Sequence, residues 1–315
     1  PSRRLPHTRS GRARRAAIPP ARPVDQWMAG TAAGHDGGLM DGDTHPTLDA
    51  GANSPHPGAM DQPMIRFDGA ARRFAGGAGV GPLDLEIARG EFVALIGGSG
   101  SGKTTTLKLI NGLVPADAGQ VFVEDEKVGE GPLPALRRRI GYVFQEVGLF
   151  PHLTVAENIA VGPRLAGWET PRIAARTAEL LALVALPAEA GARLPAQFSG
   201  GQRQRVGLAR ALAAGPALML MDEPFGALDP VTRDALGRDY RALHERLGLT
   251  TVMVTHDVAE ALLLADRIVV LDEGRVIGDG PPRELMAEAA DPIVRSLMET
   301  PRRQAAALEA LMSVA

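Results

Sequence analysis

The chain has 315 residues, of which 45% are hydrophobic, and it carries a formal net charge of −3 with a pI near 6.2. This length and composition suffice for one large or two ordinary domains, and the charge provides no global attraction to nucleic acid or anionic lipid. Because the sequence has no cysteine, disulfides, thiolate metal sites and a cysteine nucleophile are excluded. No apolar run reaches the roughly 18 residues that a membrane span needs.

Residues 1–61 differ in kind from the remainder. They begin with an arginine-rich stretch that has no acid before Asp25 and continue without sustained apolar periodicity. This composition predicts a disordered N-terminal extension. Two other interpretations stay open. One is a targeting segment, although it lacks the apolar core of a secretory signal, and the other is an upstream-extended gene model whose true start is Met60 or Met64.

Alternating apolar residues begin after Met64. They fall in three short segments, 65–67, 83–87 and 92–96, and their period of two predicts antiparallel strands that lead into the loop that follows. Phe74 lies in this layer, and on local grounds it is an ordinary core or edge aromatic.

Residues 97–104 read G-G-S-G-S-G-K-T, which fits the phosphate-binding loop pattern. The loop follows the apolar run 92–96 and precedes helix-like residues 105–110, which is the context that the motif requires. Glycines let successive backbone N–H groups point inward, and the helix adds its positive end, so main chain holds most of a polyphosphate. A merely flexible turn is the alternative in a chain with 37 glycines, and the flanking strand and helix favour the nucleotide loop.

Two side chains of this loop carry specific roles in the pattern. Lys103 would reach the β- and γ-phosphates, and the Thr104 hydroxyl would ligate Mg2+. The residues assigned to phosphate binding are Gly97, Gly98, Ser99, Gly100, Ser101, Gly102, Lys103, Thr104 and Thr105.

The middle of the chain predicts a helical insertion. Residues 139–145 indicate a buried strand that ends at Gln145, and two helices follow at 155–166 and 171–186. These helices interrupt the alternation of strand and helix, so we expect 146–200 to form a helical subdomain. A further helix follows Ser199 and continues through Leu212.

Three strand segments come late in the chain. They lie at 217–222, 251–255 and 267–271, and the last pairs with 275–277 through a tight turn. A helix at 231–247 separates the first two. Mostly apolar strands that alternate with helices predict an α/β fold with a parallel sheet covered on both faces, and such sheets bind ligands at the carboxyl ends of their strands.

The strand 217–222 ends in Asp222, and Glu223 follows directly. Paired carboxylates at the end of a buried strand are costly unless they meet a cation or a hydrogen-bond donor. Asp222 would hold Mg2+ through a water, and Glu223 would orient or deprotonate the attacking water. The alternative is a solvated turn. Gln145 can contact Mg2+ or that water through its side-chain oxygen, and His256, after strand 251–255, can sense the γ-phosphate, although a lone histidine is more often structural.

A second glycine loop precedes the helix after Ser199. Ser199, Gly200, Gly201 and Gln202 place a hydroxyl and free N–H groups at a helix start, which predicts either another anion site or an ordinary helix cap.

In this order the elements resemble the ATP-binding cassette (ABC) family of transport ATPases over residues 64–280. The motifs are G-G-S-G-S-G-K-T, Gln145, F-S-G-G-Q at 198–202, L-M-L-M-D-E at 218–223, A-L-D at 227–229, and His256. The resemblance implies a P-loop NTPase fold, an ABC cassette with a parallel-sheet core, an antiparallel β subdomain and an inserted helical subdomain. The cassette would span 62–290, followed by a short helical tail at 291–315. Phe198 departs from the leucine usual at the start of the signature.

The resemblance also implies that two cassettes pair head to tail, each ATP lying between the phosphate loop of one copy and the Ser199–Gln202 loop of the other. Phe74 would then stack on adenine, Glu223 would be the general base, and His256 the switch histidine. Asp229 would belong to the loop that links the two sites. A homodimer and a heterodimer remain open.

A finer resemblance, to ATPases of glycine betaine, choline and related osmoprotectant importers, is carried by residues 141–159 and 163–168 and by T-P-R-R-Q at 300–304. It implies a membrane permease and an extracytoplasmic substrate-binding protein as partners, no nucleic acid, and a peripheral position on the cytoplasmic face of the membrane. About 35 residues follow Gly280, too few for the paired regulatory domain of many such relatives. An importer for another solute, such as an amino acid, is the alternative, and a soluble cassette acting on DNA or ribosomes is a third possibility.

Overall fold

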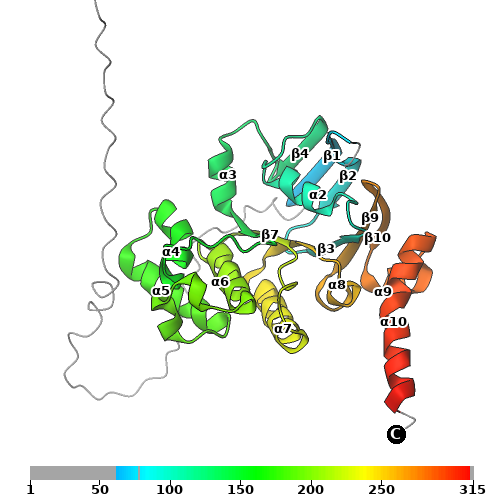
Figure 1. Ribbon diagram of the computed structural model, residues 1–315. Helices are drawn as coiled ribbons and strands as arrows, with labels where there is room; N and C mark the ends of the chain where they lie inside the picture. Colours follow the sequence, from blue (N-terminus) through cyan, green and yellow to red (C-terminus); the bar gives the residue numbers. More distant parts are fainter. Residues whose placement is uncertain (1–61, 77–78, 313–315) are drawn as a thin grey trace, which may run out of the picture. The chain divides into compact units, whose positions relative to one another are not determined.

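The computed structural model describes residues 62–76 and 79–312. These residues form two sheets and the helices around them (Figure 1). The extension expected at 1–61 lies outside the described residues. None of the described helices combines the length and apolar character that crossing a bilayer requires.

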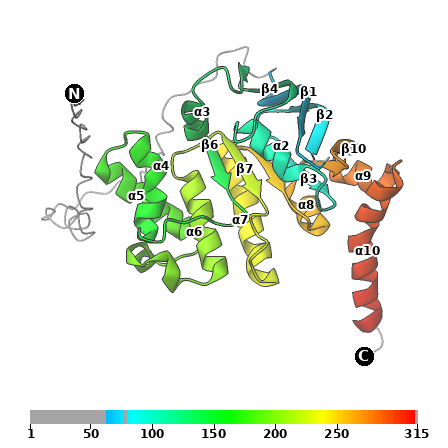
Figure 2. The ribbon, with the colours of Figure 1, turned by 45° about the horizontal axis from the view of Figure 1, so that its top comes forward.

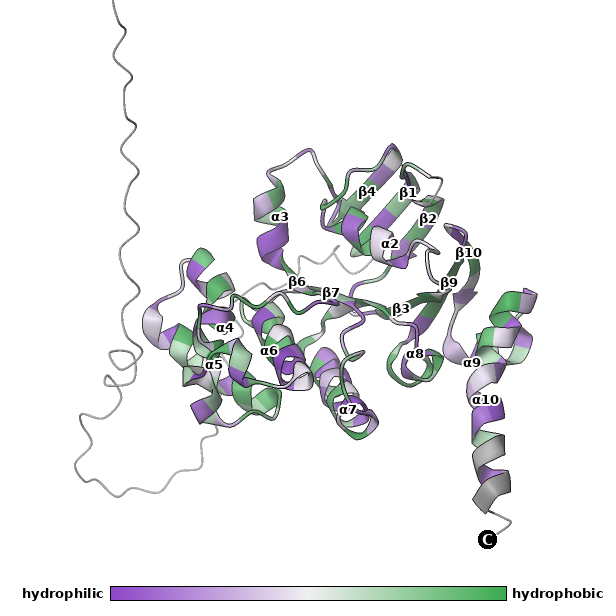
Figure 3. Cartoon of the chain, viewed as in Figure 1, coloured by the Kyte–Doolittle hydropathy of each residue, from purple (hydrophilic) through white to green (hydrophobic). Residues whose placement is uncertain are grey.

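The smaller sheet is antiparallel and has the strand order β2-β1-β4-β5. Its strands are β1 (Ile65–Arg73), β2 (Gly79–Ile87), β4 (Ala118–Val123) and β5 (Glu126–Lys127). Phe67 of β1 pairs with Leu85 on one side and Val121 on the other, and all three are buried. Green and purple residues alternate along these strands in Figure 3, as expected for a sheet with one buried face. The alternation at 65–67 and 83–87 thus predicted this sheet correctly, and β4 and β5 had no prediction.

The larger sheet has the order β10-β9-β3-β8-β7-β6, and all its neighbours are parallel except the hairpin β9–β10. Its strands are β3 (Phe92–Gly97), β6 (Ile140–Val143), β7 (Leu218–Asp222), β8 (Thr250–Val254), β9 (Arg267–Asp272) and β10 (Arg275–Gly280). The expected hairpin is present, and its two turn residues, Glu273 and Gly274, both have positive φ, which matches the twist of tight hairpins.

One strand was grouped wrongly by its pattern. Phe92–Gly97, expected with the antiparallel strands, lies instead in the larger sheet between β8 and β9 and is parallel to both. Successive side chains of this strand point to opposite faces of the sheet, and each face packs on a hydrophobic core; neither face meets solvent. Phe92 belongs to the core beneath the larger sheet, whereas Val93 and Leu95 belong to the core shared with the smaller sheet.

Helices cover both faces of the larger sheet (Figures 1 and 2). On the side of the smaller sheet lie α2 (Lys103–Ile110) and α3 (Leu133–Arg139), and on the other side lie α6 (Gly200–Leu212), α7 (Pro230–Leu247) and α8 (Val258–Leu264). Helices α3 and α8 had no prediction. Arg139, expected to begin a strand, is the last residue of α3, so the strand begins at Ile140.

The predicted helices of the insertion are α4 (Val155–Leu165) and α5 (Thr170–Leu183), which pack against α6. Two short 3-10 helices, η2 (Ala188–Ala192) and η3 (Pro195–Gln197), connect them to α6. Thr154 and Glu157 form a reciprocal capping box that fixes the start of α4. At the other end of the chain, α9 (Pro282–Glu288) and α10 (Pro292–Met312) follow the sheet.

Candidate active site

The loop 97–104 joins the carboxyl end of β3 to the first residue of α2. It runs so close to β9 that a Cβ on Gly97 would lie 2.0 Å from the Leu271 carbonyl oxygen. Gly97 also has a φ of 146°, which disfavours any residue with a side chain. Backbone geometry therefore requires the first glycine of the motif.

Lys103 is almost buried, with 9% of its surface exposed. Its Nζ donates to the carbonyl oxygens of Gly97 at 2.9 Å and Gly98 at 2.7 Å. Burial lowers the pKa of Lys103, and the nearby charges of Glu223 and Asp222 oppose that shift. The loop thus holds the ammonium group against its own main chain at the N-terminus of α2.

Thr104 and Asp222 bring two oxygen atoms together at the carboxyl end of β7. The Thr104 hydroxyl donates to Asp222 Oδ1 at 2.9 Å, and Asp222 is 5% exposed. Burial raises the pKa of Asp222, which this hydrogen bond opposes. A divalent cation would favour the ionised form through its charge.

The donor set of this corner fits Mg2+. No group of three or more His, Asp or Glu side chains in the described residues is arranged to hold a metal ion by itself. Mg2+, however, commonly takes only one or two protein oxygens and completes its shell with waters and substrate phosphates. Thr104 and Asp222 beside the phosphate loop meet that requirement.

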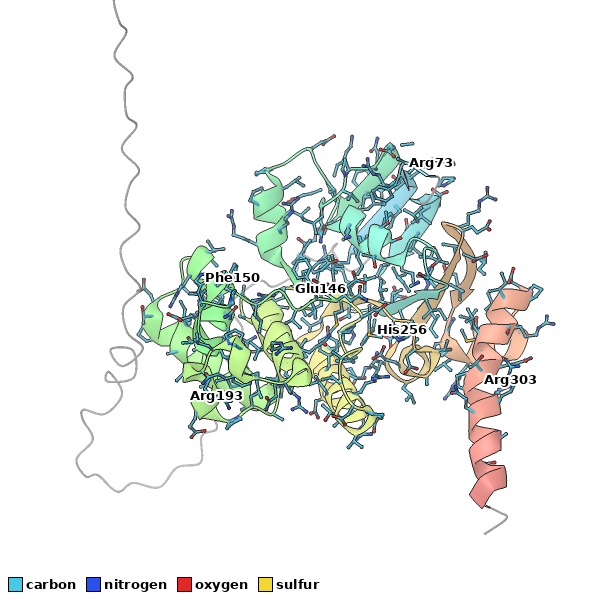
Figure 4. The ribbon with its side chains drawn as sticks, viewed as in Figure 1. Arg73, Glu146, Phe150, Arg193, His256 and Arg303 are labelled. Atoms are coloured by element: carbon cyan, nitrogen blue, oxygen red, sulfur yellow. The ribbon has the colours of Figure 1, made fainter. Side chains whose placement is uncertain are left out.

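Glu223 is the centre of the second half of the site. Its Oε2 accepts a hydrogen bond from Gln145 Nε2 at 3.0 Å and lies 3.4 Å from His256 Nδ1. These three residues follow β7, β6 and β8, three adjacent strands of the larger sheet, so parallel order brings them together. Figure 4 labels His256 near the start of α8.

The backbone of Glu223 is held in an unusual conformation. Its φ is +48°, a region that non-glycine residues rarely adopt, and its N–H donates to the Val254 carbonyl at 2.9 Å. Its own carbonyl accepts from Gln204 Nε2 at 3.1 Å. Gln204 was missed by the sequence analysis, and the only signal is a polar residue on the apolar face of α6. We infer that this clamp sets the direction of the Glu223 carboxylate.

A cavity of about 500 Å³ joins these residues. Phe74 stands at its edge, 40% exposed, with the Arg72 guanidinium carbon 5.1 Å from the centre of its ring. Gly79 also lines it and had no sequence prediction. The lining residues are Phe74, Gly79, Gly97, Ser99, Gly100, Gly102, Lys103, Thr104, Thr105, Gln145, Glu223 and His256.

The glycine loop at 199–202 lines a different cavity, also of about 500 Å³, together with Asp229. Ser199 caps α6, and its Oγ accepts from Gln202 N at 3.2 Å while Gln202 Oε1 accepts from Ser199 N at 3.0 Å. Asp229 caps α7 by accepting from Thr232 N at 3.0 Å, and that hydrogen bond lowers the pKa of Asp229. Of these two cavities of the described residues, Lys103 lines the first and not the one that contains Ser199 and Asp229.

The departure at Phe198 is accommodated by packing. Its side chain is 5% exposed, and the guanidinium carbon of Arg193 lies 4.4 Å from its ring centre, a cation–π contact. The Phe198 carbonyl accepts from Arg203 Nη1 at 2.6 Å. Arg193 lies with the helices of the insertion in Figure 4. The larger ring therefore packs inward and leaves the Ser199 loop free.

The sequence is similar to that of proteins of known family. The sequence model of the ABC transporter family matches residues 80–226. The glycine betaine uptake system ATP-binding protein YehX of Escherichia coli (strain K12) is 49% identical over 232 residues, 74% of this chain and 75% of that protein. The glycine betaine/carnitine/choline transport ATP-binding protein OpuCA of Bacillus subtilis (strain 168) is 46% identical over 236 residues, 75% of this chain and 62% of that protein. The chain thus spans less than two thirds of the length of OpuCA.

Similarity extends to a transporter of another kind and to a solved structure. The sulfate/thiosulfate import ATP-binding protein CysA of Xylella fastidiosa (strain 9a5c) is 48% identical over 238 residues, 74% of this chain and 68% of that protein. The dimeric, post-hydrolysis structure of the ATP-binding cassette MJ0796 bound to ADP and Pi superposes with a TM-score of 0.65 at 32% identity. That match covers 69% of this chain and 98% of the cassette.

Proposed function

Since this chain belongs to the ABC transporter family, we propose that it is the ATP-hydrolysing subunit of an importer that moves a small solute through a separate membrane permease. One observation carries the proposal. The Glu223 carboxylate meets Gln145 and His256 at the same cavity that the phosphate loop and Lys103 line. A carboxylate so placed is positioned to orient water against a bound γ-phosphate.

ATP would bind with its phosphates on the backbone of loop 97–104 and its adenine on the ring of Phe74. Lys103 would transfer its hydrogen bonds from the Gly97 and Gly98 carbonyls to the β- and γ-phosphates. Asp229 and residues 199–202 would contribute from a second copy.

Hydrolysis would be general-base catalysis. Glu223 takes a proton from water as the water oxygen attacks the γ-phosphorus, the bond to the β-phosphate oxygen breaks, and ADP and phosphate form. Gln145 and His256 keep the carboxylate and the water in line. When bound, Mg2+ would neutralise phosphate charge; Thr104 and Gln145 would hold it through their oxygens, and Asp222 would hold it through a water.

A second copy of the chain would complete the site. The Ser199–Gln202 loop places the start of α6 on a cavity that Lys103 does not line. Because an anion held between two such surfaces joins them, ATP would close a dimer. The dimeric cassette structure with ADP and Pi supports this arrangement.

For the cargo we propose a quaternary amine osmoprotectant such as glycine betaine. The supporting relatives are YehX and OpuCA and the osmoprotectant import protein OsmV of Salmonella typhimurium, which is 42% identical over 241 residues. CysA favours the alternative of another solute, because its 48% identity is as high. If the cassette never touches the cargo, its sequence should be about equally similar to those of ATP-binding proteins for different cargoes. The cassette would lie on the cytoplasmic face of the membrane, with an external binding protein that delivers the cargo.

Reconstitution with the permease tests this function. Vesicles that contain the permease and this chain should take up labelled glycine betaine or choline on addition of ATP and Mg2+, and a Glu223→Gln chain should give no uptake. Uptake of sulfate or an amino acid instead would favour the alternative cargo. ATP hydrolysis without uptake of any solute would contradict the importer.

A further inference from the structure

An ion pair joins two segments of the chain, one of which contributes residues to the cavity of the Ser199 loop and the other His256 to the first cavity. It joins Arg233, in the first turn of α7, to Asp257, the residue that caps α8. Arg233 follows the 227–229 loop, and Asp257 follows His256. The pair therefore connects the segment beside the Ser199 loop with the segment that carries the histidine of the nucleotide cavity.

Arg233 uses both ends of its guanidinium group. Nη1 donates to Asp257 Oδ2 at 3.1 Å, and Nη2 donates to the Leu228 carbonyl at 3.2 Å. About a third of each charged side chain is exposed, 30% for Arg233 and 33% for Asp257. Ion pairs as exposed as this one contribute little to the free energy of folding. Its main physical effect is to fix the positions of the two segments it joins.

Asp257 divides its two carboxylate oxygens between two tasks. Oδ1 accepts from the backbone N–H groups of Ala259 and Glu260 at 3.0 and 3.2 Å and so caps α8. Oδ2 accepts from Arg233, and the backbone N–H of Asp257 donates to Thr255 Oγ1 at 3.0 Å. The residues on both sides of His256 are therefore anchored, one to the end of β8 and the other to α7.

Leu228 continues the contact toward the other cavity. A Cβ on Gly201 would lie 2.9 Å from Leu228 Cδ2, so these two residues pack directly. Both also line the cavity of the Ser199 loop. A continuous path of contacts thus leads from Gly201 through Leu228, Arg233 and Asp257 to His256, which lies 3.4 Å from the Glu223 carboxylate.

We propose that Arg233, through Asp257, is a positioning residue that holds His256 at the nucleotide cavity in register with the 227–229 loop. The proposal rests on ATP hydrolysis as the proposed function. A copy whose Ser199 loop engages a nucleotide presses on Leu228, and Arg233 is the side chain that connects this loop to His256 of the same copy.

The test uses four variants of the full chain, Arg233→Ala, Arg233→Lys, Asp257→Asn and the double variant Arg233→Ala with Asp257→Asn. Asparagine caps a helix as well as aspartate does, so Asp257→Asn removes the charge and keeps the cap. Arg238→Ala is the matched control, since Arg238 lies on the same helix and, within the described residues, pairs only with exposed Asp234. Steady-state ATP hydrolysis gives kcat and KM, and thermal unfolding gives Tm.

Misplacement of His256 should lower kcat by about tenfold to a hundredfold in Arg233→Ala and Asp257→Asn, with KM changed by less than about twofold. The double variant should be no slower than the slower single variant, because both changes break one interaction. Arg233→Lys should recover part of kcat, since one ammonium cannot bond both Asp257 and Leu228 in the geometry of the fork. Arg238→Ala should match the wild type.

Three results would overturn the proposal: unchanged kcat in both single variants, additive losses in the double variant, or a fall in Tm with KM and kcat changing together. The last result would mean that the pair merely supports the fold. Failure of the proposed function itself is recognised separately. In that case any ATP hydrolysis measured with the wild type or with Arg238→Ala would be equally high with Glu223→Gln.

Discussion

The two cavities have the same volume, about 500 Å³, yet their polar groups differ in kind. Lys103 lines the first cavity, and the neighbouring Thr104 donates to the buried Asp222; burial moves the pKa values of Lys103 and Asp222 toward the neutral forms. In the other cavity, Ser199 and Asp229 already serve as helix caps and sit at the surface. The buried charge of Lys103 favours a charged ligand at the first cavity, whereas the second offers the start of α6, where a helix favours an anion that another molecule brings.

This difference implies that binding and hydrolysis of ATP can be separated by substitution. Changes at the first cavity that spare Lys103 should stop chemistry and keep binding. Changes at the second cavity should prevent assembly and keep binding to a single copy. Removing Lys103 should weaken binding itself.

The largest effect is expected from Glu223→Gln. Loss of the general base should lower ATP turnover by about a hundredfold to ten thousandfold, while ATP affinity stays near that of the wild type. ATP that is bound and not hydrolysed should hold the dimer closed. Phosphate release measures the first effect, and size-exclusion chromatography with ATP measures the second. Wild-type turnover would remove Glu223 from its role.

Ser199→Arg should follow in size. A long cation at the start of α6 would fill the second cavity and block approach of another copy, so turnover should fall by about a hundredfold. Nucleotide affinity of the monomer, measured with a fluorescent ATP analogue, should be unchanged. Ser199→Thr keeps a hydroxyl cap and is the matched control. Undiminished turnover in Ser199→Arg would mean that the two cavities do not share a nucleotide.

Lys103→Ala should lower ATP affinity by about tenfold to a hundredfold, which is the range for loss of a hydrogen bond from a charged group. Turnover should fall with it. Titration of the same fluorescent analogue measures the affinity, and Lys108→Ala, at the far end of α2, controls for general loss of positive charge. Equal affinity in Lys103→Ala and the control would show that the first cavity does not depend on its buried cation.

The sequence analysis named most of the residues that line the first cavity, but not the contacts that orient them. Gly97–Thr104 is a local motif, and Gln145, Glu223 and His256 follow adjacent parallel strands, so one rule about strand ends brings them together. Gln204, Arg233 and Gly79 had no prediction, because each acts through a contact with a segment far away in the chain.

Missed elements of the fold have equally physical causes. Strand β4 begins with three exposed residues, 118–120, and therefore lacks a readable alternation. Helix α8 is a single short segment that owes its start to the Asp257 cap. Strand β3 was assigned to the wrong sheet. Alternation in the sequence distinguishes the two faces of a strand, but it does not reveal that both faces of β3 are buried.

The smallest effect concerns a buried histidine that packs against Phe92, the first residue of β3. His244 is 2% exposed, its Nδ1 lies 3.0 Å from Thr251 Oγ1, and its ring centre lies 5.1 Å from that of Phe92. Burial lowers the pKa of His244 below 6.5, and the charge of Arg241 lowers it further, against the opposing charges of Asp266 and Glu245. The unfolded chain therefore binds the proton first as the pH falls.

The free energy of unfolding should consequently be highest above pH 6.5 with respect to this group and should fall between pH 7.5 and 5.5, by at most about 1.4 kcal/mol. Urea unfolding at both pH values measures it. His244→Asn, which retains a polar group for Thr251, is less stable throughout but should lose this part of the pH dependence. The difference in slope between the two proteins cancels the carboxylates that titrate in both. Equal slopes would mean that His244 does not titrate against the core.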